Sequence, residues 1–194
     1  LRKKVVEFLG HKDARRGSVE VAFYGGNFLG LPKKYRTALL EEVQALICDG
    51  KANGIRFSTR PDPAFLSHMK DLNTYAISAI ELGVQSMDDH VLDLIRRGHT
   101  AEDICRSVEI LKSHGHSVGV QIMPGLPGDT PQTILETAFR VVALSPDFVR
   151  IYPTVVVKGT VLERWFRSGQ YEPLTLDQAV EITKKLLLLF TDHH

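Results

Sequence analysis

Short apolar runs alternate with longer amphipathic segments along most of this chain. Apolar runs of this length, bounded by glycine and proline, predict strands, and a period of three to four residues predicts helices. Strands are predicted over residues 19–26, 55–61, 76–86, 117–125 and 148–156. Helices are predicted over residues 31–50, 63–72, 88–98, 101–115, 130–145, 159–169 and 176–190. This alternation predicts parallel βαβ units with right-handed crossovers.

Turn residues mark several ends of these elements. Pro32 suits a helix start and Gly50 a helix stop. In GLPGD (125–129), proline and glycine predict a tight strand-to-helix turn, with Asp129 or Thr130 capping the next helix.

The polar positions in the strands distinguish two possible architectures. Five βαβ strands could form an open doubly wound sheet, whose strands are usually apolar throughout, or most of a β/α barrel. Here polar or small residues recur at every second position, towards the C-terminal strand ends: Arg56, Ser58 and Arg60; Glu81, Gly83 and Gln85; Gly119, Gln121 and Met123; Arg150, Tyr152 and Thr154. An active site in a barrel mouth has this distribution. We therefore predict an α/β fold, an incomplete TIM-like barrel, since five strands cannot close the eight-stranded form.

Composition narrows the class of protein. A chain of 194 residues, 43% of them hydrophobic, can bury one core, and we predict a single domain over residues 1–194 with C-terminal helices from about 160. The net charge of +1 and the lack of long basic runs give no electrostatic sign of nucleic-acid binding. No apolar segment is long enough to span a bilayer, and the N-terminal stretch lacks the apolar centre of a signal peptide. Cys48 and Cys105 are far apart, which argues against a disulfide scaffold and favours a cytoplasmic protein. Together with the lack of a membrane-spanning segment, this predicts no membrane partner.

Common catalytic and nucleotide-binding motifs are absent from the sequence. It contains no GxxxxGK[ST] or GxGxxG, and its histidines lack metal-ligand spacing. The strand-borne amides, hydroxyls and guanidiniums bind well but are poor catalysts alone, which favours a polar cofactor that brings its own chemistry. The glycines of FYGGN (23–27) fit either a turn or the close approach of such a ligand.

Six motifs occur in a specific order: FYGGN (23–27), LP (31–32), STRPD (58–62), ELGVQSMDD (81–89), RRGHT (96–100) and GVQIMPGLPGDT (119–130). Over residues 19 to 156 this order resembles the radical S-adenosylmethionine (radical SAM) enzymes. The similarity is greatest to the catalytic subunit of Elongator and its bacterial relatives. The oxygen-independent coproporphyrinogen III oxidases are a more distant match.

The resemblance implies a fold, two cofactors and a reaction. It implies a partial (β/α)6 barrel, with SAM bound to a [4Fe–4S] cluster that is held by the cysteines of a CxxxCxxC loop. Cleavage of SAM then gives a 5′-deoxyadenosyl radical. This chain departs from the family because it has no CxxxCxxC. We expect the first barrel strand and the cluster ligands to lie outside the chain, and the chain alone to be inactive.

The family's SAM-binding positions can be matched to residues of this sequence. The resemblance implies that Gly25, Gly26 and Asn27 meet the SAM amino group, although asparagine is a mild departure. Ser58, Thr59 and Gln85 match positions near the ribose. Arg97 matches an arginine that pairs with the SAM carboxylate. Gln121, Ile122, Tyr152 and Pro153 match positions beside adenosine.

Three residues have alternative interpretations. Arg97 follows Arg96 before Gly98, so it could be a solvated helix cap. Gln85 could satisfy a buried backbone group. Glu81 shares the face of Gln85 and is expected to touch SAM, Arg56 or a substrate, because a buried acid needs a partner.

Three functions are compatible with the sequence. The leading hypothesis is a radical SAM enzyme that modifies RNA, with the tRNA wobble uridine as the target that the resemblance implies and an electron donor as a further partner. The second is a coproporphyrinogen oxidase-like enzyme with a small-molecule substrate. The third is a non-catalytic SAM- or nucleotide-binding module.

Overall fold

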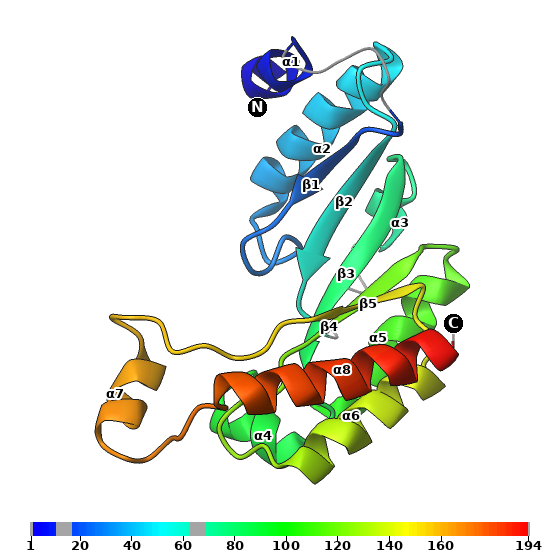
Figure 1. The fold of residues 1–194 in the computed structure, drawn as a ribbon. Coiled ribbons are helices and arrows are strands. Elements are labelled where there is room, and N and C mark those ends of the chain that lie inside the picture. The colour runs from blue at the N-terminus through cyan, green and yellow to red at the C-terminus, as the bar shows by residue number, and fades with distance from the viewer. Residues whose placement is uncertain (1, 11–16, 63–68, 194) are drawn as a thin grey trace.

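The structure is a computed structural model that describes residues 2–10, 17–62 and 69–193. Its centre is one sheet of five parallel strands in the order β1-β2-β3-β4-β5 (Figure 1). The strands are β1 (Glu20–Phe23), β2 (Gly54–Thr59), β3 (Ile77–Gln85), β4 (Val118–Ile122) and β5 (Phe148–Ile151). Every strand pairs with the next one in sequence, as in a β/α barrel, whereas a doubly wound sheet reverses its strand order. The predicted open, incomplete barrel is confirmed.

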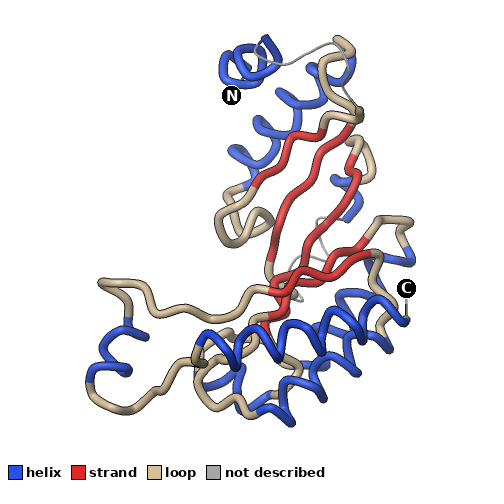
Figure 2. Tube along the Cα trace, in the orientation of Figure 1, coloured by secondary structure: helices blue, strands red, loops and turns tan. Residues whose placement is uncertain are grey.

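One helix precedes the first strand, and the others connect the strands or follow the last of them (Figure 2). They are α1 (Arg2–Gly10), α2 (Lys33–Cys48), α3 (Met69–Leu72), α4 (Asp89–Leu94), α5 (Ala101–Ser113), α6 (Pro131–Ala143), α7 (Val161–Arg167) and α8 (Leu176–Asp192). The sequence patterns did not single out α1. Residues 63–68 of the helix predicted over 63–72 lie outside the described residues. None of the helices in the described ranges is long and apolar enough to cross a membrane.

Local signals explain where two of these helices begin. Pro32 is the residue before α2, as predicted, since its fixed φ and missing N–H suit a helix start. Thr130, rather than Asp129, caps α6: its hydroxyl accepts a hydrogen bond from the N–H of Thr133 at 3.1 Å.

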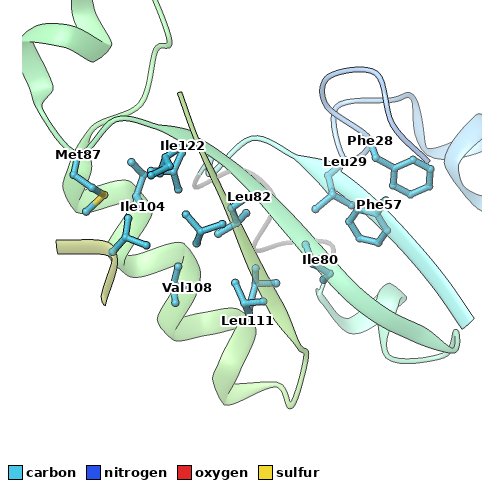
Figure 3. Packing of buried hydrophobic residues seen from close by; sticks show 14 of the residues in the cluster. Phe28, Leu29, Phe57, Ile80, Leu82, Met87, Ile104, Val108, Leu111 and Ile122 are labelled. Atoms are coloured by element: carbon cyan, nitrogen blue, oxygen red, sulfur yellow. The ribbon is translucent and has the colours of Figure 1, made fainter. Parts of the chain in front are cut away.

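The core lies between the helices and one face of the sheet. Alternate strand residues such as Phe57, Leu82 and Val120 point to this face and are almost fully buried. They join a cluster with residues of α2, α5, α6 and α8. Figure 3 shows part of this cluster, with Ile104, Val108 and Leu111 of α5. The opposite face carries the predicted polar positions, so burial of the apolar positions fixes which side chains face the barrel interior.

Several strands are shorter than predicted, and β5 most clearly. It ends at Ile151, although the apolar pattern continues to residue 156. Beyond that point Tyr152 and Thr154 still donate to the carbonyls of Ile122 and Pro124, but Pro124 and Pro153 have no N–H. The ladder therefore stops, and Val155 and Val157 are exposed.

On the interior face, the Phe148 ring lies over Gly119, its register partner on the neighbouring strand. A Cβ at position 119 would lie 2.2 Å from this ring. We expect Gly119→Ala to lower the free energy of unfolding by about 2 kcal/mol, because the added methyl group and the Phe148 ring cannot both keep their positions. Denaturant unfolding measures the change. Gly17→Ala is the control, since a Cβ there meets no atom within 4 Å in the part of the chain that the structure describes, and equal stabilities of the two variants would contradict the prediction.

Candidate functional site

A cavity of about 640 Å³ lies at the C-terminal ends of the five strands. Eight predicted site residues line it together: Gly25, Gly26, Ser58, Thr59, Gln85, Arg97, Gln121 and Tyr152. Tyr24, Gly83, Ile95, Met123 and Leu126 complete the wall. A single chain segment does not build this site, because each of the five strands delivers residues to it. This is the position at which β/α barrels carry their sites.

Three predicted site residues do not line this cavity. Ile122 is 1% exposed and packs in the core, because it follows Val118 and Val120 on the helix-facing side of β4. Pro153 follows Tyr152 but is not part of the wall. Asn27 does not line the cavity either, and its side chain hydrogen-bonds to the wall residue Thr59 instead.

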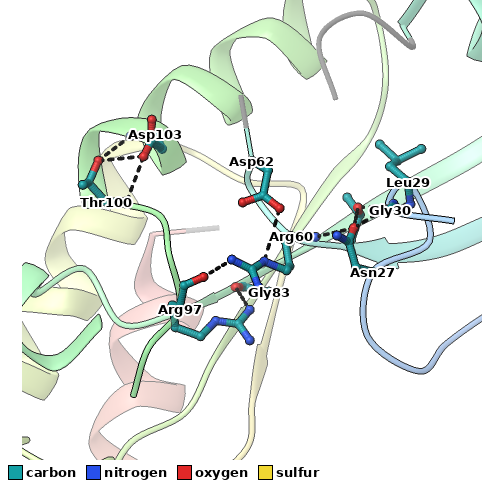
Figure 4. A network of polar contacts seen from close by, with 10 residues as sticks. Asn27, Leu29, Gly30, Arg60, Asp62, Gly83, Arg97, Thr100 and Asp103 are labelled. Carbon is teal, nitrogen blue, oxygen red and sulfur yellow. Dashed lines mark hydrogen bonds and ion pairs between the residues drawn. The ribbon is translucent and has the colours of Figure 1, made fainter. Parts of the chain in front are cut away.

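The Asn27 side chain fastens the loop after β1 to the end of β2. Its Oδ1 accepts hydrogen bonds from the Thr59 hydroxyl at 2.7 Å and from the Gly30 N–H at 3.2 Å (Figure 4). Gly30 must lack a side chain, since its Cβ would lie 2.6 Å from the Asn27 amide nitrogen. The Phe28 ring stacks on Phe57 at 4.7 Å, which anchors the same loop in the core.

Gly25 and Gly26 are left free to face the cavity. Their φ angles are +121° and +122°, in a region of backbone conformation that residues other than glycine rarely adopt. A Cβ at either position would meet no atom of the described residues within 4 Å. The two glycines are therefore not needed for packing between protein atoms, and they expose backbone to the cavity.

On β3, the missing side chain of Gly83 makes room for two polar groups. A Cβ there would lie 2.7 Å from the Gln85 amide nitrogen and 3.1 Å from the Arg97 guanidinium. A register shift at Gly83/Gln85 and a φ of +69° at Gln85 turn this side chain over the strand. The Gln85 Oε1 then accepts a hydrogen bond from Gln121 Nε2 at 3.0 Å, across the strand pair.

Arg97 reaches back from the segment after α4. One guanidinium nitrogen donates to the Gly83 carbonyl at 2.9 Å, and its Nε is buried without a partner among the described residues. Burial, followed by the nearby charge of Arg60, lowers the pKa of Arg97, which still leaves it a cation at neutral pH. Arg60 donates to the Arg97 carbonyl and pairs with Asp62 at 3.2 Å (Figure 4). Arg97 is therefore a half-buried positive charge with an unused donor, and not a solvated helix cap.

Glu81 lies deeper in the barrel and is almost fully buried. Its carboxylate accepts a hydrogen bond from the Tyr24 hydroxyl at 2.7 Å and contacts Arg150 Nε at 3.0 Å and Arg56 at 3.6 Å. Of the three partners expected for Glu81, the structure contains Arg56. Arg150 also donates to the Tyr152 hydroxyl at 3.0 Å, so this network orients both tyrosines of the cavity wall.

Profiles of known families match nearly the whole chain. The Radical SAM superfamily matches residues 3–141, and the Radical_SAM C-terminal domain matches residues 146–194. The chain belongs to the radical SAM superfamily. This family implies SAM and a [4Fe–4S] cluster as cofactors.

Individual relatives support the same assignment. The chain is 30% identical over 193 residues to a tRNA uridine(34) acetyltransferase from Dehalococcoides mccartyi, covering 89% of this chain and 41% of that protein. It is 30% identical over 201 residues to human Elongator complex protein 3, covering 93% and 36% respectively. The chain therefore spans well under half the length of these curated relatives.

Solved structures share the fold. An archaeal Elp3 with an N-terminal deletion, from Methanocaldococcus infernus, superimposes with a TM-score of 0.78 at 23% identity, over 95% of this chain and 48% of that one. Coproporphyrinogen III oxidase from Escherichia coli has a TM-score of 0.72 at 18% identity, over 99% and 44%.

The residues fit one implied cofactor and not the other. The exposed glycine backbone, the buried Nε of Arg97 and the amides of Gln85 and Gln121 suit a polar ligand with a carboxylate, such as SAM. The cluster does not fit, because the sequence has two cysteines and neither lines the cavity. Within the described ranges no three His, Cys, Asp or Glu side chains form a metal site.

Sequence reasoning did not assign Tyr24, Ile95 or Leu126 to the site. Tyr24 directly precedes the glycine pair and could have been inferred from that position. Ile95 and Leu126 are apolar residues in a helix end and a turn, and no spacing separates them from core residues.

The turn that carries Leu126 depends on Asp129. The Asp129 carboxylate accepts hydrogen bonds from the N–H groups of Gly125 at 3.0 Å and Leu126 at 2.9 Å. Burial raises the pKa of Asp129 to about 6 in spite of these bonds. The turn is therefore most stable with this carboxyl protonated.

This shift predicts a pH dependence of stability. The Asp129 carboxyl keeps its proton to a higher pH in the folded state than in the unfolded state. The contribution of this protonation to the free energy of unfolding is fully present below about pH 4 and is lost as pH rises to about 6. We expect wild type to lose of the order of 2 kcal/mol relative to Asp129→Asn between pH 4 and pH 7. Urea unfolding across this range measures the difference. Parallel pH profiles for the two proteins would contradict the shift.

Proposed function

We propose that this chain is the SAM-binding part of a radical SAM enzyme that modifies the wobble uridine of tRNA. The observation that carries the proposal is the convergence of the motif residues on one polar cavity at the strand ends. The substrate class rests on the relatives, one of which is named a tRNA uridine(34) acetyltransferase.

In this proposal SAM lies across the five strand ends. The backbone at Gly25 and Gly26 meets the methionyl amino group, and Arg97 pairs with the carboxylate, for which a planar guanidinium is well suited. Ser58, Thr59 and Gln85 approach the ribose, while Gln121 and Tyr152 approach adenosine. Ile122 and Pro153 would support this position through the backbone, since neither side chain lines the cavity.

Radical generation belongs, in this proposal, to the assembled enzyme. The cluster would need thiolates from outside these 194 residues, and its reduction would need an electron donor. What this chain contributes is the binding and orientation of SAM.

The two other functions receive less support. The likeness to coproporphyrinogen III oxidase is at 18% identity and carries the fold alone. A binding module without catalysis would require that the complete protein hold no cluster, which iron and sulfide analysis of the full-length product would test directly.

Arg97→Ala tests the proposed SAM site. We expect SAM affinity of the cluster-reconstituted, full-length protein to fall at least tenfold, because a charge-assisted hydrogen bond to the carboxylate is lost. Isothermal titration calorimetry under anaerobic conditions measures the dissociation constant. Arg106→Ala, which removes an exposed arginine of α5, is the matched control. Unchanged affinity in Arg97→Ala would mean that Arg97 only binds the Gly83 carbonyl.

A further inference from the structure

A second cavity, of about 560 Å³, adjoins the proposed SAM cavity. Ile95, Met123 and Leu126 line both cavities. The remaining wall of the second cavity comes from the end of α4, the turn after β4, the segment after β5, and α7: Leu94, Arg96, Pro127, Thr154, Val155, Val161, Leu162, Arg164 and Trp165. A ligand in this cavity would be separated from SAM only by three apolar side chains.

Arg96 has an unusual backbone conformation at the rim of this cavity. It follows α4 with a φ of +54°, where glycine is the usual residue because a side chain costs energy there. The helix end closes with hydrogen bonds from Arg96 N–H to the Asp93 carbonyl and from Arg97 N–H to the Leu92 carbonyl. Two consecutive arginines thereby line neighbouring cavities, Arg97 the first and Arg96 the second.

Helix α7 supplies the opposite side of the cavity. It lies away from the barrel, between the extended segment after β5 and the segment that leads to α8 (Figure 1). Its Arg164 is exposed and its Trp165 is half-buried. Within the part of the chain that the structure describes, neither the Arg96 nor the Arg164 guanidinium has a hydrogen bond or an ion pair to a protein group.

We propose that this second cavity binds a nucleotide of the RNA substrate, with its base stacked against Trp165 and its flanking phosphates paired with Arg96 and Arg164. The choice of RNA rests on the function proposed above; the position and the three residues rest on this cavity. An aromatic ring beside unpaired guanidiniums is the combination with which proteins bind single-stranded RNA.

The composition of the wall indicates how such a nucleotide is recognised. Most lining residues are apolar, and the polar side-chain groups are those of Thr154, the two arginines and the indole N–H of Trp165. Stacking and phosphate contacts carry little base specificity, so the cavity holds the nucleotide beside SAM without reading its base edges. A ligand without phosphates would leave both cations unpaired.

The first measurement uses the fluorescence of Trp165, the single tryptophan of the chain. We expect an unmodified tRNA anticodon stem-loop with uridine at the wobble position to quench this fluorescence. Coproporphyrinogen III, added as a competitor, is expected not to displace the RNA. Displacement by this compound, or the absence of any quenching, would overturn the proposal.

The second measurement compares variants by fluorescence anisotropy with a labelled stem-loop. Trp165→Ala is expected to weaken RNA binding roughly tenfold without changing its salt dependence. Arg96→Ala and Arg164→Ala are each expected to weaken binding and to reduce the slope of log Kobs against log[salt] by about 0.7. Trp165→Phe should restore most of the affinity, and Arg106→Ala is the control.

Arg96→Gly separates binding from folding. Glycine relieves the left-handed backbone, so we expect an equal or higher Tm together with the same loss of RNA affinity as in Arg96→Ala. SAM affinity should stay unchanged in all these variants. RNA binding that is equal in wild type and in the Arg96, Arg164 and Trp165 variants would overturn this site while leaving the proposed function intact. SAM binding without any RNA binding by wild type would instead overturn the substrate class itself.

Discussion

The missing side chain at Gly83 is the constraint on which the cavity depends. A Cβ at this position would lie 2.7 Å from the Gln85 amide nitrogen and 3.1 Å from the Arg97 guanidinium, so the ends of both side chains, which lie over β3, would have to move. Gln85 in turn holds Gln121 on the next strand, and Arg97 reaches the Gly83 carbonyl. One backbone position therefore joins two strands and the segment after α4 into a single polar surface. An exchange to alanine would force these groups apart even if the sheet still formed.

The loop after β1 shows a division of roles within one short motif. Phe28 and Asn27 fasten it, through ring stacking and through hydrogen bonds to the end of β2, so that Gly25 and Gly26 need make no contacts of their own. Deeper in the barrel, Glu81 holds Tyr24 and Arg150 in the same way. In this loop the residues that fasten it, Asn27 and Phe28, are thus distinct from the two glycines that face the cavity. This is the arrangement expected where a ligand must meet a preorganised surface.

The sequence predicts the fold and most of the cavity, for a physical reason. Strand alternation is set by burial, so the alternating pattern alone assigns the polar positions of β2 to β5 to the barrel interior. Two residues matched through the resemblance do not line the cavity. Ile122 continues the apolar face of β4, as its alternation with Val118 and Val120 indicates, and Asn27 turns back to β2. Ile95 and Leu126 line the cavity from a helix end and a turn, and the second cavity depends on α7, whose placement no local pattern specifies.

The wall between the two cavities has a thermodynamic consequence. Ile95, Met123 and Leu126 present one side to each cavity, so a ligand on either side restricts their rotamers. The first ligand to bind would pay the conformational entropy of ordering these three side chains. The second ligand would then bind against side chains that are already ordered. Binding of the two proposed ligands would then be cooperative without any movement of the backbone. Because such coupling is reciprocal, each ligand would raise the affinity for the other by the same factor.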